Sequence, residues 1–370
     1  MSDVLECDCL IIGGGITGTV AAKLLLEHGH KVMLVEESSS SKIRLAESLP
    51  ASIEPLLARI GLFELLTSGP HVRHTGMVSS WGSPLLQTAP LVAAHHGWKI
   101  DKQFFIEQIR STLPKQSTLL GRVKDARRVE QGWQCSINCA NTQNKLVIKA
   151  RFVLDASGRQ GYLPRVLNLQ RHTFDKLSAF VTNMSLKAPI QNQPAVAVEA
   201  FRDGWTLVSK ISDHESMLAI FCNQFTPDFG KLKQCENWHS IAKQTHWFRK
   251  ALPQEPFDIK TLNASSHIIS QLHGDNWLIA GDAAMSFDPL SSHGMTTAIY
   301  MAEKSAQAIH KAFEGEQGAL GNYSETMTQI YNSYLNELLG HYRREQRFTD
   351  SKFWQSKQQF SAPEVLKVVG

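Results

Sequence analysis

The chain has 370 residues, a net charge of +4 and a pI near 8.6, and its basic residues are scattered without a long run. This length can bury a large core in one or two domains, and scattered charge does not predict binding to nucleic acid. No apolar run approaches the ~20 residues of a membrane span, and the acidic start is unlike a signal peptide. The six cysteines lack metal-binding or C-x-x-C spacing. We therefore expect free thiols, no metal, no membrane partner and a cytoplasmic location.

The first 36 residues carry a dinucleotide-binding pattern. Residues 9–12 predict a buried strand, residues 16–28 a helix, and residues 31–35 a second buried strand that is closed by Glu36. The turn before the helix has the spacing G-x-G-x-x-G, formed by Gly13, Gly15 and Gly18. Such glycines permit a tight turn, close approach of the backbone to a pyrophosphate, and close helix–strand packing. Glu36 is placed to accept hydrogen bonds from a ribose. The alternative is a glycine-rich turn in an ordinary α/β domain.

Two later turns have a similar character. Strands predicted within residues 117–154 form a meander that delivers Asp155 and Gly158, and a buried strand at 277–280 delivers Gly281 and Asp282. A helix expected over 296–313 would direct the positive end of its dipole toward an anionic ring. The loop at 42–50, with Arg44 and Glu47, suits either a cofactor contact or a solvated surface.

The middle of the chain has a different texture. Short alternating runs within residues 166–270 predict an antiparallel sheet of at least four strands, with one face turned inward as a substrate wall. Residues 70–97 are predicted to be irregular, with their histidines on the surface. Residues 52–66 read as a helix that contains Gly61 or is broken by it, and Asn322 as the cap of a long C-terminal helix.

Three glycine-containing turns carry a resemblance to a known family; they are Gly13-x-Gly15-x-x-Gly18, Asp155-x-x-Gly158 and Gly281-Asp282. In this order and at these distances, they resemble the turns of the single-component FAD monooxygenases of the p-hydroxybenzoate hydroxylase fold. Within that group, Glu47-Ser-Leu-Pro50, Trp98-Lys-Ile-Asp101 and Asp288-Pro-Leu-Ser-Ser resemble the branch of flavin-dependent halogenases and geranylgeranyl reductases. The nearest likeness is to halogenase-like flavoproteins that mature cysteine tryptophylquinone enzymes, the partners of lysine ε-oxidase and glycine oxidase.

This resemblance implies an α/β fold with three parts. A three-layer, Rossmann-like FAD-binding domain would comprise residues 1–60, 98–165 and 270–320. An inserted antiparallel-sheet substrate domain would comprise 61–97 and 166–269, and a C-terminal helical segment would comprise 321–370.

The resemblance also implies FAD as the cofactor. The expected contacts are Gly13, Gly15, Gly18, Glu36, Arg44, Glu47, Lys102, Val123, Asp155, Gly158, Gly281, Asp282, Pro289, Gly294 and Met295. Lys102 stands where arginine is usual, so its contact would be a point charge. His293 is the candidate for handling protons beside the flavin ring, because histidine titrates near neutral pH. Its alternative role is that of a structural loop histidine.

The activity implied is that of a flavin-dependent monooxygenase, which uses O₂ and an external reductant, NAD(P)H or a reductase. Its substrate would be a tryptophan in the precursor of a quinone-dependent amino-acid oxidase. The sequence lacks the W-x-W-x-I-P motif of flavin halogenases, so halogenation is less expected than hydroxylation. Two alternatives stay open. One is a small-molecule oxidoreductase: an indole or phenol hydroxylase, a halogenase-like enzyme or a prenyl reductase. The other is a flavin-bound assembly factor without catalysis.

Overall fold

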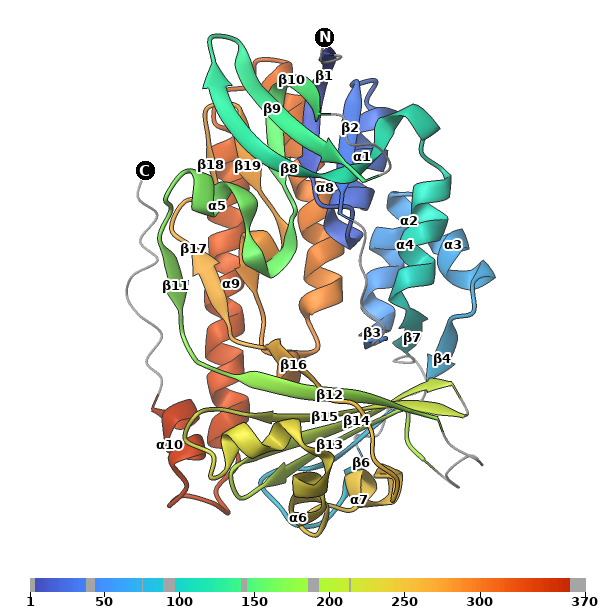
Figure 1. Ribbon diagram of the computed structural model, residues 1–370, viewed down its shortest axis with the longest axis vertical. Helices are drawn as coiled ribbons and strands as arrows, with labels where there is room; N and C mark the ends of the chain where they lie inside the picture. The colour runs from blue at the N-terminus through green and yellow to red at the C-terminus, as the bar shows by residue number, and fades with distance from the viewer. Residues whose placement is uncertain are drawn as a thin grey trace.

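The computed structural model describes residues 4–359 except 38–43, 75, 89–96, 141–144, 186–192 and 213. Its largest layer is a seven-stranded sheet (Figure 1). Its strands are β1 (Val4–Ile12), β2 (Val32–Glu36), β8 (Thr118–Val129), β9 (Gly132–Cys139), β10 (Lys145–Asp155), β19 (Trp277–Ile279) and β18 (His273–Gly274). β1 pairs in parallel with both β2 and β10, and β10 pairs in parallel with β19. The predicted meander is confirmed as the antiparallel run β8–β9–β10.

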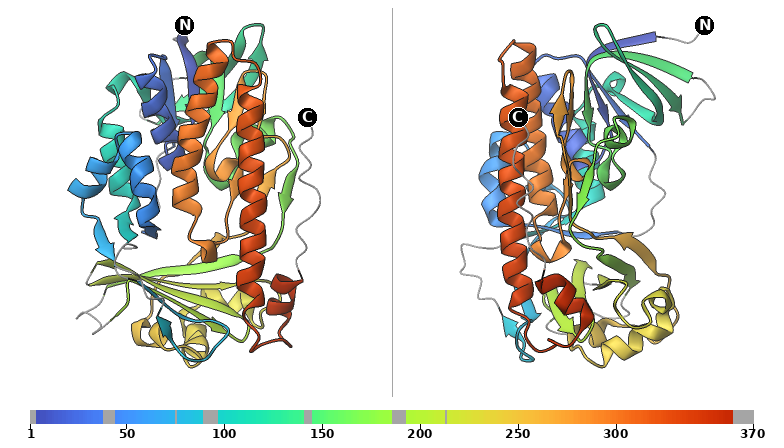
Figure 2. Two further views of the ribbon diagram at one scale, coloured as in Figure 1. Left: turned by 180° about the vertical axis from the view of Figure 1, so that it is seen from behind. Right: turned by 90° about the vertical axis from the view of Figure 1, so that its left-hand side faces the viewer.

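Three helices cover one face of this sheet. They are α1 (Ile16–Glu27), α8 (Gly294–Phe313) and α9 (Ala319–Arg343), and Figure 2 shows α8 and α9 standing side by side along it. The sequence places these helices correctly because Gly29, at φ 82°, ends α1, and because their apolar positions are buried. The predicted cap at Asn322 is wrong. The helix begins at residue 319, after Gly318 at φ 85°.

A second seven-stranded sheet lies across the lower end of the molecule in Figure 1. Its strands, in order, are β16 (Lys260–Asn263), β12 (Ser178–Ser185), β15 (Glu215–Cys222), β14 (Gly204–Ser212), β13 (Val196–Phe201), β5 (Met77–Ser80) and β6 (Gln87–Thr88). Residues alternate between its faces. On β12, Phe180 packs in a separate apolar cluster between the sheet and the helices α6 (Trp238–Ala242) and α7 (Trp247–Ala251). Its neighbours Ala179 and Val181 face the opposite way, into the larger core shared with the first sheet.

Residues 70–97 are more regular than predicted. Within their described part they form β4 (Val72–His74), β5 and β6. These strands are too short to leave a pattern in the sequence; β4 and β5 pair with strands distant in the chain, and β6 pairs with the nearby β5. β5 joins β13, while β4 joins β7 (Gly97–Asp101) in a small sheet with β3 (Ala46–Leu49). His71 is buried rather than on the surface, and His95 and His96 lie outside the described residues.

The remaining elements connect these layers. They are α2 (Glu54–Arg59), α3 (Phe63–Ser68), α4 (Lys102–Ser111), α5 (Tyr162–Val166), α10 (Lys352–Gln358) and a small sheet of β11 (Arg171–Thr173), β17 (His267–Ile269) and β20 (Met285–Ser286). Gly61, at φ 68°, breaks the helix expected over 52–66 into α2 and α3. Asp101 caps α4 as predicted, accepting from the Phe104 amide at 3.1 Å. None of the helices in the described ranges is both long and apolar enough to cross a bilayer.

Candidate functional site

The three predicted turns meet at one edge of the first sheet. In the parallel register Ile12 lies beside Asp155, and Asp155 beside Ile279. The carboxyl ends of β1, β10 and β19 therefore lie together, and the turn that follows each strand begins at this edge. Ligands of open α/β sheets bind at such carboxyl ends. Two cavities open here, and both are lined by Gly15, Ala156 and Gly158.

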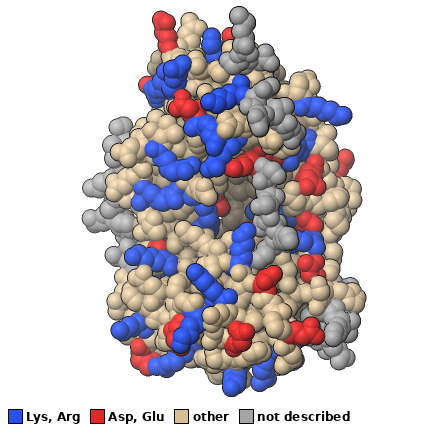
Figure 3. Space-filling model, viewed as in Figure 1, with Lys and Arg blue, Asp and Glu red and all other residues tan. Residues whose placement is uncertain are grey.

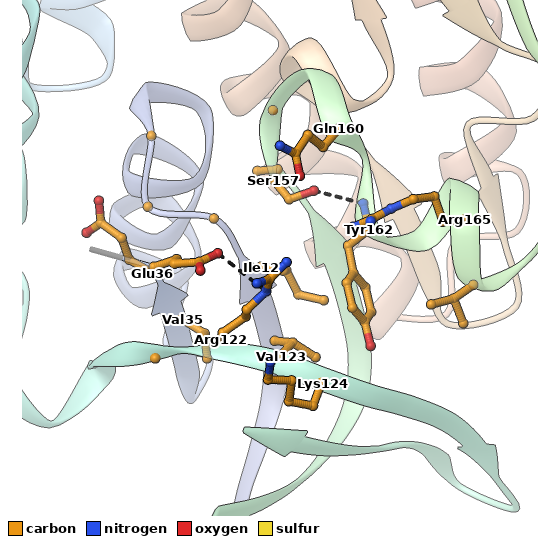
Figure 4. A pocket seen from close by; sticks show the side chains of 18 of the residues that line it. Ile12, Val35, Glu36, Arg122, Val123, Lys124, Ser157, Gln160, Tyr162 and Arg165 are labelled. Carbon is orange, nitrogen blue, oxygen red and sulfur yellow. Dashed lines mark hydrogen bonds and ion pairs between the residues drawn. The ribbon is translucent and has the colours of Figure 1, made fainter. Parts of the chain in front are cut away.

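The first cavity, of about 670 Å³, lies between the glycine turn, the end of β2 and the strand β8. Figure 4 shows Glu36, Arg122, Gln160 and Tyr162 around it. Five residues that the sequence predicts as FAD contacts line this cavity: Gly13, Gly15, Glu36, Val123 and Gly158. Arg122, Lys124 and Arg165 add positive charge at its border.

Two polar side chains of this cavity differ in how they are paired. Oε2 of Glu36 forms an ion pair with Arg110 Nη2 at 2.5 Å. Burial raises the pKa of this carboxyl, while the charge of Arg110 opposes the rise. The hydroxyl of Tyr162, in contrast, is buried without a partner among the described residues. A bound group with hydroxyls or ring nitrogens would satisfy this hydroxyl, since an unpaired buried polar group costs about 1–3 kcal/mol.

The three glycines of the turn do different work. A Cβ on Gly13 would lie 2.4 Å from the Ala156 carbonyl oxygen, and a Cβ on Gly18 would lie 1.9 Å from the Gly13 oxygen. These two positions therefore keep the turn, the strand and the helix close together. A Cβ on Gly15 would meet nothing within 4 Å. Gly15 thus leaves room for a ligand to approach the backbone.

The second cavity, of about 370 Å³, lies between the glycine–acid turns and the inner face of the second sheet. Its sheet wall consists of Ala179, Val181, Val196, Val198, Trp205, Leu207, Ser209, Met217, Ala219, Phe221, Leu262 and Asn263. The ring of Trp205 stacks on that of Phe221, with centroids 3.8 Å apart. The space-filling view shows a hollow near the middle of one face with lysine and arginine side chains at its border (Figure 3).

The charged groups lining this cavity have partners within the protein. Lys102 Nζ lies 3.1 Å from Glu47 Oε1, and Glu47 is the main cause of the raised pKa of Lys102. Arg159 Nε lies 3.6 Å from Asp282 Oδ2, and its other nitrogens donate to Ser265, Ser286 and Phe287. A ligand entering here therefore meets an apolar wall and charges that are already paired.

Asp288, the last charged residue of the lining, belongs to a buried network. Its Oδ2 accepts from the Tyr342 hydroxyl at 2.8 Å and from Lys357 Nζ at 3.0 Å. Lys357 also donates to Asp175 Oδ2 at 2.6 Å. Burial raises the pKa of Asp288, and the charge of Lys357 opposes that rise. The Trp205 indole donates to the Tyr342 hydroxyl at 3.1 Å, which links the network to the cavity wall.

Most predicted contacts line one of these cavities. Glu47, Lys102, Asp282, Pro289, Gly294 and Met295 line the second. Gly18, Arg44, Asp155, Gly281 and His293 line neither. Arg44 pairs instead with Asp101 and Glu215 at 2.8 and 2.7 Å. Asp155 accepts from the amides of Ser157 and Leu163 and so shapes its own turn.

The structure also adds residues that the sequence did not single out. Arg110, at the end of α4, reaches both Glu36 and the Gly14 carbonyl oxygen. Arg159 had a local signal, since it directly follows Gly158. Arg110 and Tyr162 had none, because only tertiary packing brings them to the first cavity.

Two family profiles match the chain. The tryptophan halogenase profile matches residues 79–369, and the NAD(P)-binding Rossmann-like domain matches residues 11–41. The first covers well over half of the chain, which decides the family. The protein belongs to the tryptophan halogenase family.

Among relatives, the putative FAD-dependent oxidoreductase LodB of Marinomonas mediterranea is 27% identical over 96% of this chain and 98% of its own. Tryptophan 2-halogenase of Chondromyces crocatus is 24% identical over 83% of this chain and 62% of its own. Among solved structures, the halogenase CndH has a TM-score of 0.83 at 20% identity, covering 96% of this chain and 86% of that one. The peptidyl tryptophan dihydroxylase QhpG has a TM-score of 0.76 at 20% identity, covering 95% and 79%. These structures establish the flavin-halogenase fold.

As a tryptophan halogenase family member, the protein is a FAD-dependent oxidoreductase. The two cavities fit that cofactor. The Glu36 carboxylate and the Tyr162 hydroxyl, which has no partner among the described residues, suit the adenosine part, and the open space at Gly15 suits the pyrophosphate. The N-terminus of α8 begins at the second cavity, where a flavin ring would supply the redox chemistry, and the buried Thr296 hydroxyl near it has no partner in the described part of the chain. There the helix dipole would stabilise negative charge on that ring.

Proposed function

We propose that the protein hydroxylates a tryptophan ring of a protein precursor during biogenesis of a cysteine tryptophylquinone cofactor. The overall change is that a ring C–H, O₂, two electrons and two protons give a ring C–OH and water. NAD(P)H or a separate reductase supplies the electrons. The precursor of a quinone-dependent amino-acid oxidase is the proposed partner.

The observation that carries this proposal is the character of the second cavity. Its sheet wall offers mostly apolar side chains, with Trp205, the Ser209 hydroxyl and the Asn263 amide as the polar groups, and the lining charges already have partners within the protein. A free amino acid would have to draw partners for its ammonium and carboxylate from lining charges that already pair with protein groups, which weakens its binding. A tryptophan side chain within a polypeptide has neither charge and presents only its ring.

One similar protein favours this proposal, and a second supports the FAD-dependent oxidoreductase class alone. QhpG is named as a peptidyl tryptophan dihydroxylase essential for tryptophylquinone biogenesis, and its fold is shared over 95% of this chain. LodB, named as a putative FAD-dependent oxidoreductase, matches over nearly its whole length.

The second candidate is halogenation of an aromatic ring. The family profile and the similarity to tryptophan 2-halogenase favour it. In that case a halide would replace a ring hydrogen, with the same need for reduced flavin and O₂.

One experiment separates these activities. The holoenzyme, reduced and supplied with ¹⁸O₂ and chloride, is incubated with an unmodified oxidase precursor or with free tryptophan, and peptides are mapped by mass. We expect ¹⁸O on one tryptophan of the precursor and none on free tryptophan. Chlorine on either substrate would establish the halogenase instead, and oxygenation of free indoles alone would establish a small-molecule hydroxylase.

A further inference from the structure

Lys99 is a buried lysine next to the second cavity whose role the site described above does not explain. It lies on β7 with 8% of its surface exposed. Its Nζ lies 3.0 Å from Ser48 Oγ on β3 and 2.6 Å from Ser209 Oγ on β14. Both serines line the second cavity. The ammonium is therefore one hydroxyl group away from a bound ligand.

This lysine forms no ion pair within the described residues. The nearby Glu47 acts on it through charge alone, and Glu47 is already paired with Lys102. Across the small sheet Val72 lies beside it in the β4 register, and the facing group on β14 is the Ser209 hydroxyl. Burial lowers the pKa of Lys99 to about 8, with Glu47 opposing the change. Both protonation states are therefore accessible near neutral pH.

The hydroxyls of Ser48 and Ser209 connect Lys99 to the cavity. When Lys99 is an ammonium, each hydroxyl oxygen accepts a hydrogen bond from it, so the hydrogen of each serine stays available. When Lys99 is a neutral amine, its lone pair can accept the O–H of one serine, whose oxygen then faces the ligand. Neither hydroxyl donates to another group among the described residues. Lys99 thus polarises two O–H donors that line the cavity, although its own ammonium does not line it.

We propose that Lys99 is a positioning residue that, through Ser48 and Ser209, forms a proton relay to the aromatic ring bound in the second cavity. The inference deepens the proposed function and rests on it. When oxygen adds to the ring, the ring becomes cationic and must lose one proton. A serine oxygen takes that proton and releases its own to the neutral amine of Lys99. The resulting ammonium later returns the proton to solvent, and no electrons move in the relay.

The probe for this relay is 4-nitrophenol, a small ring whose O–H ionisation changes its colour. Its titration is followed by difference spectra in oxidised holoenzyme at saturating concentration. A cation acting through the serines should lower the apparent pKa of the bound probe by about 1 unit relative to the free probe. Lys99→Arg should keep this shift, Lys99→Met should abolish it, and Ser209→Ala should reduce it. Lys149→Met, at an exposed position of β10, is the matched control and should behave as wild type.

A second measurement addresses Lys99 itself. In protein labelled with ¹³C at lysine Cε, the signal lost in Lys99→Arg should titrate near pH 8 in the holoenzyme. A signal that titrates with the exposed lysines would overturn the proposal. So would a Lys99→Met variant that is less stable yet retains the full shift of the bound probe, because the lysine would then only connect two sheets.

These measurements involve no turnover and no protein precursor. If the precursor stays unmodified while the Lys99-dependent shift in the pKa of bound 4-nitrophenol is present, the proposed function is wrong. The relay would then still stand as a property of the cavity. If the ring is hydroxylated but the pKa of the bound probe does not depend on Lys99, the proposed function stands and the relay is wrong.

Discussion

The hydroxyl of Tyr342, near the end of α9, donates to Asp288 Oδ2 across 54 positions of sequence at 2.8 Å. Asp288 lines the second cavity, so the C-terminal region reaches the wall of the candidate site. Lys357 on α10 completes the contact, because its ammonium bridges Asp288 and Asp175. The last helices are therefore part of the site's support.

Lys357→Met should strongly destabilise the protein. Removing the cation leaves Asp288 buried without a counter-ion, and breaking a buried pair from one side costs about 3–5 kcal/mol. The free energy of unfolding from denaturant titration measures this cost. Lys352→Met, at an exposed position of the same helix, should change it by less than about 0.5 kcal/mol. Equal effects of the two variants would show that the network contributes no stability.

Two glycine variants should separate folding from cofactor binding. Gly13→Ala places a Cβ 2.4 Å from the Ala156 oxygen at a φ of 106°, so the apoprotein should lose stability by at least about 1–3 kcal/mol. Gly15→Val projects into open space between the two cavities and should leave the apoprotein's stability nearly unchanged. It should instead block FAD binding, measured as flavin absorbance per protein after gel filtration. A yellow Gly15→Val protein would show that the pyrophosphate lies elsewhere.

Asp282→Ala should weaken FAD retention more than Glu47→Ala does. Asp282 follows the glycine turn directly after β19 and is held beside Arg159, whereas Glu47 belongs to a short edge strand and pairs with Lys102. A carboxylate at the turn is placed to accept hydrogen bonds from the ribityl chain. FAD occupancy is compared after dilution and re-isolation. The same FAD occupancy in wild type and Asp282→Ala would show that the ribityl chain does not contact Asp282.

His267 should make the fold sensitive to acid. Burial and the charges of Arg171 and Arg159 lower its pKa from 6.5 to about 3. The unfolded chain therefore binds a proton first as the pH falls. The stability contributed by neutral His267 is complete above about pH 6.5 and is lost progressively toward pH 3, at up to about 1.4 kcal/mol per pH unit.

Unfolding titrations between about pH 6.5 and pH 4 should show a shallower decline in His267→Asn than in wild type. His239→Asn, at an exposed position, should retain the wild-type slope. Parallel declines in wild type and His267→Asn would assign the acid sensitivity to other groups.

The elements that sequence reasoning located are those whose signal is local. The strand, glycine turn, helix and strand around Gly13 form a continuous pattern, and the alternation of β12 and β15 is visible because one face of that sheet is covered by the main core and the other by α6 and α7. The short strands β4 and β6 had no such signal, because their pairing partners stabilise them rather than their own residues.

The candidate site was predictable in its turns and less so in its side chains. Glu47 and Asp282 adjoin recognisable motifs. Nothing in the sequence around Lys99 distinguishes it from other lysines, because its contact with Ser209 depends on the packing of β14 against β7. Lys357 likewise contacts aspartates that lie 69 and 182 positions away. Burial of a charge is a tertiary property, so residues of this kind could not be found from spacing.

The order of strands in the first sheet has a consequence for biosynthesis. β1 leaves the ribosome first, yet its neighbour β10 begins at Lys145, and β10 in turn awaits β19 at Trp277. Lys357, whose ammonium contacts Asp288, is synthesised later than β19. At about 5–20 residues per second, the first turn waits roughly 13 to 53 seconds for the end of β19 to complete its binding edge. A cofactor can therefore contact all three turns only after β19 and the turn that follows it have been synthesised.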